Sequence, residues 1–79
     1  MDALTLYTTP SCGFCLRLKG RLDKAGVTYS EIDVESDEDA AAFVEETNSG
    51  PRTVPVVVYP DGRVVTNPEP RDVLAAVGA

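Results

Sequence analysis

Apolar and polar residues alternate in two rhythms along this chain, and the rhythms predict its secondary structure. Residues 3–7 alternate with period two and are rich in β-formers, which is typical of a strand. Beyond Cys12, apolar residues recur every three or four positions and predict a helix. Its apolar stripe consists of Cys15, Leu18, Leu22 and Ala25. We expect Ser11 to be the N-cap of this helix and Gly26 to end it. Gly20 lies inside it, which we interpret as a close approach of helix to sheet.

A second strand and a second helix follow. Residues 28–34 predict the strand. Ser36 or Asp37 can cap a helix that ends near Thr47, and the acidic residues of its first turn suit the helix dipole. Its apolar stripe consists of Ala40, Phe43 and Val44. Because strand, helix and strand follow one another, we expect two parallel strands joined by a right-handed crossover.

The last part of the chain predicts a hairpin and a helix. Residues 56–59 are consecutively apolar, which favours a central strand covered on both faces. Pro-Asp-Gly at 60–62 predicts a turn, and residues 63–66 the partner strand. A last helix is expected at about 71–77. The order βαβαββα predicts an α/β protein of one domain over residues 1–79, with a four-stranded mixed sheet flanked by three helices.

Composition and charge narrow the classes of partner. The net charge of −6 disfavours nucleic acid, whose phosphates attract basic proteins. No apolar run has the length of a membrane span, and the first residues do not resemble a signal peptide. We therefore expect a cytoplasmic protein that binds neither nucleic acid nor a membrane, and we expect a monomer. Four of the seven basic residues follow the cysteines; they fit a solvated helix face, a positive field near the thiols, or both.

Cys12 and Cys15 are the only cysteines, three positions apart. A bridge between them closes too short a loop to serve as a structural staple. A closed zinc site takes four ligands, and the chain has no histidine and no further cysteine, although a cluster shared by two chains stays open. A C-x-x-C motif that follows a strand and opens a helix is typical of a redox pair. Cys12, where unpaired helix amides favour a thiolate, is the candidate nucleophile, and Cys15 the resolving thiol.

Pro55 is the second informative position. It stands just before an apolar strand, where proline cannot donate a ladder hydrogen bond. Two interpretations fit the sequence: a proline that starts the strand, or a proline that follows a cis peptide bond.

Three motifs together resemble the glutaredoxin branch of the thioredoxin-like superfamily: Tyr7-Thr8-Thr9, Cys12-Gly13-Phe14-Cys15 and Thr53-Val54-Pro55. The resemblance implies a minimal thioredoxin fold and a nucleophilic Cys12. It also implies a cis peptide between Val54 and Pro55 beside the nucleophile, with the main chain of Val54 pairing with a bound low-molecular-weight thiol. Thr53 belongs to this thiol-binding segment. Phe14 is a candidate contact for partners, and Arg52 for the bound thiol.

One departure from the glutaredoxin pattern bears on the thiol. Glutaredoxins that use glutathione usually carry Gly-Gly-x-Asp-Asp before the last helix, and here residues 66–70 read Thr-Asn-Pro-Glu-Pro. The aspartate pair that would meet a charged head group is missing, and buried charges need partners. The hydroxyl of Thr66 and the amide of Asn67 suit a neutral, hydroxyl-rich ligand such as mycothiol.

The cysteine motif, residues 16–19 and 48–55, and the Thr66-Asn67-Pro68 turn resemble mycoredoxins, the glutaredoxin-like proteins of bacteria that make mycothiol. This resemblance implies reduction of mixed disulfides between mycothiol and protein cysteines. It implies no bound cofactor or metal; mycothiol is the co-substrate, and an NADPH-dependent mycothiol disulfide reductase supplies electrons indirectly.

Two alternatives remain open. One is a redoxin that is reduced by thioredoxin reductase and donates electrons to ribonucleotide reductase, for which both cysteines would be essential. The other is an iron–sulfur carrier, since Cys-Gly-Phe-Cys differs by one atom type from the Cys-Gly-Phe-Ser motif of cluster-binding glutaredoxins.

Overall fold

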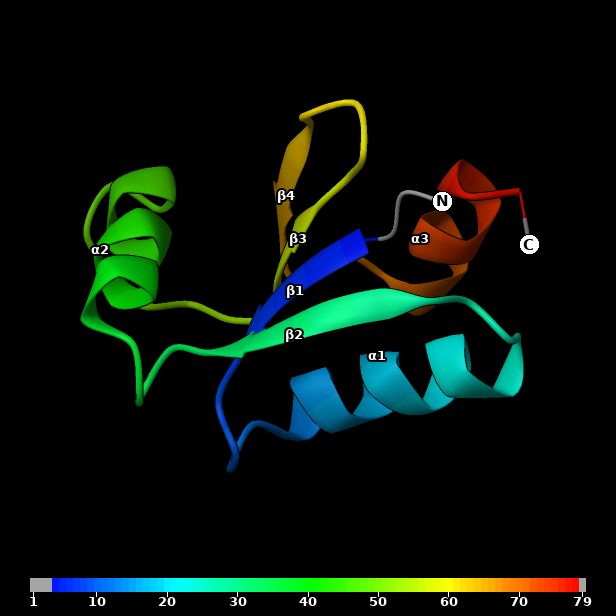
Figure 1. Cartoon of the computed structure of the whole chain (residues 1–79), viewed down its shortest axis with the longest axis horizontal. Coiled ribbons are helices and arrows are strands. Elements are labelled where there is room, and N and C mark those ends of the chain that lie inside the picture. Colours follow the sequence, from blue (N-terminus) through cyan, green and yellow to red (C-terminus); the bar gives the residue numbers. More distant parts are fainter. Residues whose placement is uncertain (1–3, 79) are drawn as a thin grey trace.

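The computed structural model describes residues 4–78 and confirms the predicted order of elements (Figure 1). Within these residues the elements are β1 (Leu4–Thr8), α1 (Gly13–Lys24), β2 (Tyr29–Asp33), α2 (Glu38–Thr47), β3 (Val56–Val58), β4 (Val64–Thr66) and α3 (Pro70–Ala76). Ala3, where the sequence predicts the start of the first strand, lies outside the described residues. No helix among residues 4–78 is long and apolar enough to cross a membrane.

The four strands form one mixed sheet in the order β2-β1-β3-β4. β1 pairs with β2 in parallel, as the strand–helix–strand order predicts, and β3 pairs antiparallel with both β1 and β4. The predicted central position of β3 is confirmed, since neighbours flank it on both sides and Val56 and Val57 are fully buried. The hairpin turn after β3 closes through hydrogen bonds between Tyr59 and the residues Gly62 and Arg63.

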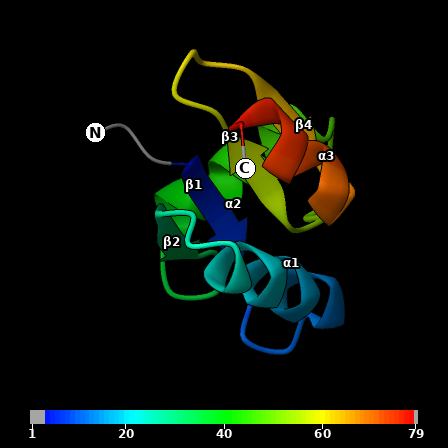
Figure 2. The ribbon, with the colours of Figure 1, turned by 90° about the vertical axis from the view of Figure 1, so that its right-hand side faces the viewer.

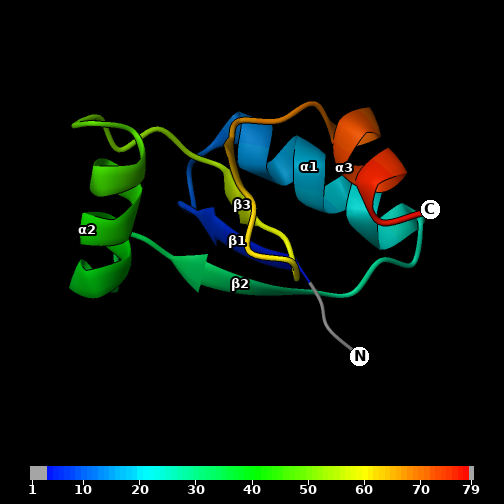
Figure 3. The ribbon, with the colours of Figure 1, turned by 90° about the horizontal axis from the view of Figure 1, so that it is seen from above.

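The helices cover both faces of the sheet, so the molecule has two apolar clusters. α1 and α3 pack on one face and α2 on the other, as Figures 2 and 3 show from two directions. The first cluster contains Leu4, Leu6, Leu18, Leu22, Val57, Tyr59 and Val73. The second contains Val34, Ala41, Val44 and Val56. Alternation along β1 assigns its residues to the two faces, because successive strand side chains point to opposite sides.

Local signals explain where the helices begin and end, with one correction. The N-cap of α1 is Cys12 and not Ser11, because the Cys12 sulfur accepts the hydrogen bond from the Cys15 amide while Ser11 is exposed. Asp37, not Ser36, caps α2. Gly26 ends α1 as predicted, with φ of 74° and hydrogen bonds from residues 26 and 27 back to the carbonyls of Asp23 and Leu22.

Two expectations about the buried face of α1 are wrong. Gly20 is exposed, and a Cβ added to it would meet no atom within 4 Å, so this glycine does not mark a close approach to the sheet. Ala25 is the C-cap and is exposed, because the helix has already ended where its apolar stripe would continue. The helix packs through Cys15, Leu18 and Leu22.

Candidate active site

Cys12 lies where the turn after β1 becomes α1. Its thiol is free and half-buried. The Cys15 backbone amide donates to Cys12 Sγ at 3.1 Å, and Sγ itself lies 3.8 Å from the Val54 carbonyl oxygen as a hydrogen-bond donor. At the N-terminus of a helix, such amides and the helix dipole favour negative charge on the capping atom. The site therefore offers a partly accessible sulfur at the N-terminus of a helix, where one main-chain amide donates to it.

Cys15 is also a free thiol, but its side chain is fully buried on the stripe of α1 that faces the sheet. Burial, followed by the hydrogen bond and the charge of Cys12, raises the pKa of Cys15 to about 12; the Thr9 backbone and Lys19 act in the opposite direction. A thiol with this pKa stays protonated at neutral pH and is a poor nucleophile. The burial of Cys15 agrees with its place on the predicted apolar stripe of the helix.

The loop at residues 51–55 places the Thr53-Val54-Pro55 motif next to the Cys12 sulfur. The Val54–Pro55 peptide bond is cis, as the glutaredoxin resemblance implies. Val54 is half-buried against the α2 cluster, and Pro55 is buried. The Pro55 carbonyl accepts the Asn67 amide hydrogen at 2.7 Å, so this segment is joined to the residue that follows β4. Thr53 is exposed.

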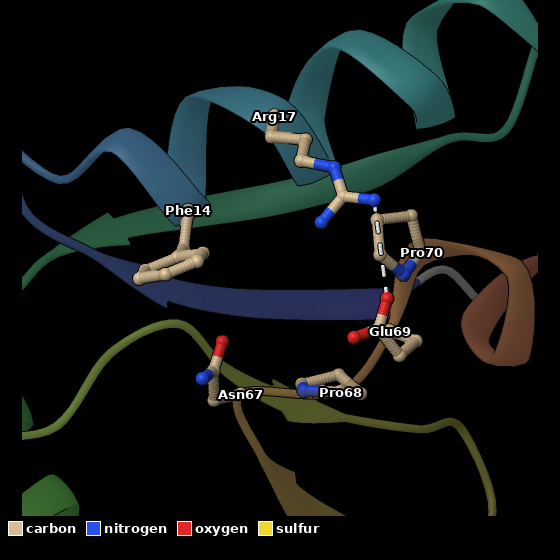
Figure 4. A pocket seen from close by; sticks show the side chains of 6 residues that line it. All are labelled: Phe14, Arg17, Asn67, Pro68, Glu69 and Pro70. Atoms are coloured by element: carbon tan, nitrogen blue, oxygen red, sulfur yellow. Dashed lines mark ion pairs between the residues drawn. The ribbon is translucent and has the colours of Figure 1, made fainter.

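A small pocket next to these residues separates α1 from the segment that leads into α3 (Figure 4). It is lined by Phe14, Arg17, Asn67, Pro68, Glu69 and Pro70. The Arg17 guanidinium reaches across to the Glu69 carboxylate at 3.9 Å, and both side chains are more than half exposed. An exposed ion pair of this length contributes little to stability, so both groups can turn to a ligand at small cost. Phe14 exposes 62% of its surface.

The structure brings some of the predicted site residues together and places others away from the site. Cys12, Cys15, Val54 and Pro55 come together, and Phe14 and Asn67 line the adjacent pocket. Arg52 is exposed and pairs with Glu45 of α2. The Thr66 hydroxyl donates to Asn48 Oδ1 at 2.7 Å, and Thr66 does not line the pocket.

Three residues at or near the site were missed by the sequence reasoning. Arg17 and Glu69 face each other across the pocket, but 52 positions separate them in the chain and no local pattern connects them. Asn48 looked like an ordinary loop residue, yet its side chain makes three hydrogen bonds. Its position just after an expected helix was one signal, since asparagine often ends helices, and the mycoredoxin-like stretch 48–55 was another.

Metal ligands are not gathered at this site. Within residues 4–78, no three His, Cys, Asp or Glu side chains are placed so that they could hold a metal ion.

Comparison with known proteins fits this geometry. Residues 4–65 match the glutaredoxin family. The chain belongs to the glutaredoxin family. Mycoredoxin 1 of Corynebacterium glutamicum is 42% identical over 79 residues, covering all of this chain and 98% of that protein. A candidate glutaredoxin of Mycobacterium tuberculosis is 49% identical over 73 residues, which are 92% of this chain and 87% of that protein.

The likeness to a solved structure concerns the fold. The glutaredoxin-like NrdH-redoxin from Escherichia coli superposes with a TM-score of 0.78 at 24% identity, over 94% of this chain and 93% of that one. The predicted thioredoxin fold and the resemblance to mycoredoxins are thereby confirmed. This glutaredoxin-like protein is a redox protein of a family whose members are thiol–disulfide oxidoreductases.

Proposed function

We propose that this glutaredoxin reduces mixed disulfides between mycothiol and protein cysteines. The observation that carries the proposal is the free Cys12 sulfur at the N-cap of α1. This sulfur accepts a hydrogen bond from the Cys15 amide and lies beside the Val54 carbonyl. The likeness to mycoredoxin 1 over the whole chain supports mycothiol as the thiol.

The first step is attack by the Cys12 thiolate on the mycothiol sulfur of the mixed disulfide. The Cys12–mycothiol disulfide forms, the original disulfide breaks, and the target protein leaves as a thiolate. The backbone amide of Cys15 supports the negative charge on Cys12 before attack. The main chain of Val54 then pairs with the cysteinyl part of the mycothiol now bound to Cys12.

The second step regenerates the enzyme. The thiolate of a second mycothiol attacks the mycothiol sulfur of this intermediate, mycothiol disulfide leaves, and the Cys12 thiolate returns. Cys15 is a weak competitor for this step. The charge of Cys12 disappears in the intermediate, but burial, the largest cause of the raised Cys15 pKa, persists. We therefore infer that the route through a Cys12–Cys15 disulfide is secondary.

The pocket between Phe14 and Asn67 is the proposed site for the sugar part of mycothiol. Its lining combines one aromatic face, one amide and an exposed pair of opposite charges. The Asn67 amide, the Arg17 guanidinium and the Glu69 carboxylate can hydrogen-bond hydroxyl groups, and the Phe14 ring can cover an apolar ring face. Thr53 and Arg52 lie on the exposed rim of the loop, where a target protein can contact them.

The test compares three electron sources for the same protein. NADPH is supplied with mycothiol and mycothiol disulfide reductase, with glutathione and glutathione reductase, or with thioredoxin reductase alone. We expect turnover of a mycothiol–protein mixed disulfide in the first arm. Efficient turnover in the third arm would instead support the redoxin alternative, and a brown protein with iron–sulfur absorption would support the carrier alternative.

Single cysteine variants test the mechanism. Cys12→Ser should abolish turnover, because it removes the attacking sulfur. Cys15→Ser should keep most of the mycothiol-dependent activity, because that sulfur is not needed for either step. If Cys12→Ser still turns over, the nucleophile has been assigned wrongly.

A further inference from the structure

The side-chain amide of Asn48 makes three hydrogen bonds. Its Nδ2 donates to the carbonyls of Pro51 and Thr53, both at 3.0 Å, and its Oδ1 accepts the Thr66 hydroxyl at 2.7 Å. Both amide hydrogens and the oxygen are thus used. The partners agree with the assignment of oxygen and nitrogen, since the two carbonyls require donors and Thr66 can donate its proton to Oδ1.

The hydrogen bonds of Asn48 reach two elements of secondary structure, α2 and β4. Asn48 is the C-cap of α2, where its backbone amide donates to the Val44 carbonyl at 3.0 Å. Thr66 is the last residue of β4. The side chain therefore connects α2 and β4 to the loop between α2 and β3, and this loop carries the Thr53-Val54-Pro55 motif of the active site.

The hydrogen bonds hold the loop on both sides of Val54. The preceding carbonyl, of Thr53, is bonded to Asn48, and the following carbonyl, of Pro55, is bonded to the Asn67 amide at 2.7 Å. The Val54 carbonyl between them faces the Cys12 sulfur at 3.8 Å. Fixing the neighbours of Val54 fixes the main-chain groups that the bound thiol would meet, and a displacement of about 1 Å at such a group can cost roughly a hundredfold in rate.

We propose that Asn48, held by Thr66, is a positioning residue that keeps the Val54–Pro55 segment at the correct distance from Cys12. The Thr66 hydroxyl then acts through Asn48 rather than on the ligand. The inference rests on thiol exchange at Cys12, as in the proposed function, but it does not depend on which low-molecular-weight thiol is used.

The experiment compares Asn48→Ala and Thr66→Val with Thr66→Ser, which keeps the hydroxyl, and with Thr47→Ala, an exposed neighbour in α2. The probe is a mixed disulfide between a cysteine peptide and the thiol that supports turnover of the unmodified protein. We expect Asn48→Ala to lower kcat/KM about tenfold and Thr66→Val about threefold, chiefly through KM. Thr66→Ser and Thr47→Ala should stay within twofold.

Two further readouts separate positioning from general damage. Alkylation of Cys12 by iodoacetamide involves no bound low-molecular-weight thiol, so its rate should change less than kcat/KM does in Asn48→Ala and Thr66→Val. Backbone ¹⁵N order parameters at Thr53 and Val54 should fall in Asn48→Ala. If Thr66→Val folds and both its KM and these order parameters equal those of the unmodified protein, the proposal is overturned. If Cys12→Ser retains turnover, the proposed function fails, while the order parameters still decide whether Asn48 holds the loop.

Discussion

Cys15 should remain nearly inert toward thiol reagents while Cys12 reacts. Burial raises the pKa of Cys15 to about 12. At pH 8, about one molecule in ten thousand then carries the Cys15 thiolate, against about one quarter for an ordinary free cysteine. Since the thiolate is the reacting form, ionisation alone slows alkylation about a thousandfold. The side chain has no exposed surface, so poor access slows the reaction further.

The assay is alkylation of the reduced protein by iodoacetamide at pH 8, followed by mass mapping of the two cysteines. In the folded protein we expect one label, on Cys12. In Cys12→Ser, where Cys15 is the sole thiol, the hydrogen bond and charge of Cys12 are gone but burial persists, so labelling should still be at least a hundredfold slower than for free cysteine. In guanidinium, which removes burial, both cysteines should react at the free rate.

A rate for Cys15 within tenfold of free cysteine, in a Cys12→Ser protein shown to be folded, would refute this reasoning. It would mean that local opening, and not the buried ground state, controls the chemistry of the second thiol. The dithiol route would then compete with attack by mycothiol.

Two predictions concern stability. The raised Cys15 pKa means that its contribution to folding is fully present below the unfolded pKa of about 8.5 and is lost as pH rises toward 12, with a slope of up to about 1.4 kcal/mol per pH unit. Urea midpoints of the reduced protein should therefore fall between pH 8 and 10, and Cys15→Ala should flatten this decline; an equal decline in the variant would contradict the assignment. Gly20→Ala should stabilise the protein by about 0.5–1 kcal/mol and raise Tm by about 3–6 °C, because the site is helical, exposed and open around the added methyl group. Gly26→Ala is the matched control and should destabilise by about 1 kcal/mol, because its φ of 74° disfavours a side chain; a Gly20 variant less stable than the parent in calorimetry would show that the helix needs this glycine.

The position of Cys12 at the start of a helix could be predicted from sequence because it depends on local features. A strand ends at Thr8 and a helix begins at Gly13, on either side of it, and the spacing to Cys15 puts the second cysteine one helical turn away. The burial of Cys15 follows from the same periodicity. The prediction of Ser11 as N-cap failed because residue preferences favour serine, whereas the chain path places the Cys12 sulfur 3.1 Å from the Cys15 amide.

Gly20 shows a limit of a different kind. A glycine inside a helix costs stability, so a compensating close contact was a reasonable expectation. Position 20 faces away from the sheet and from α3, which only the packing of α1 shows. The side of the helix that faces solvent depends on which side packs against the sheet.

By itself, the sequence determined the order of the elements, most of the two apolar stripes and the family, because periodicity and short motifs act over a few neighbouring residues. The tertiary structure alone decided that Glu69 lies across from Arg17 and that Asn48 lies between its loop and Thr66. These contacts join residues that are up to 52 positions apart, and they depend on the exact register of sheet and loops, which no local pattern encodes.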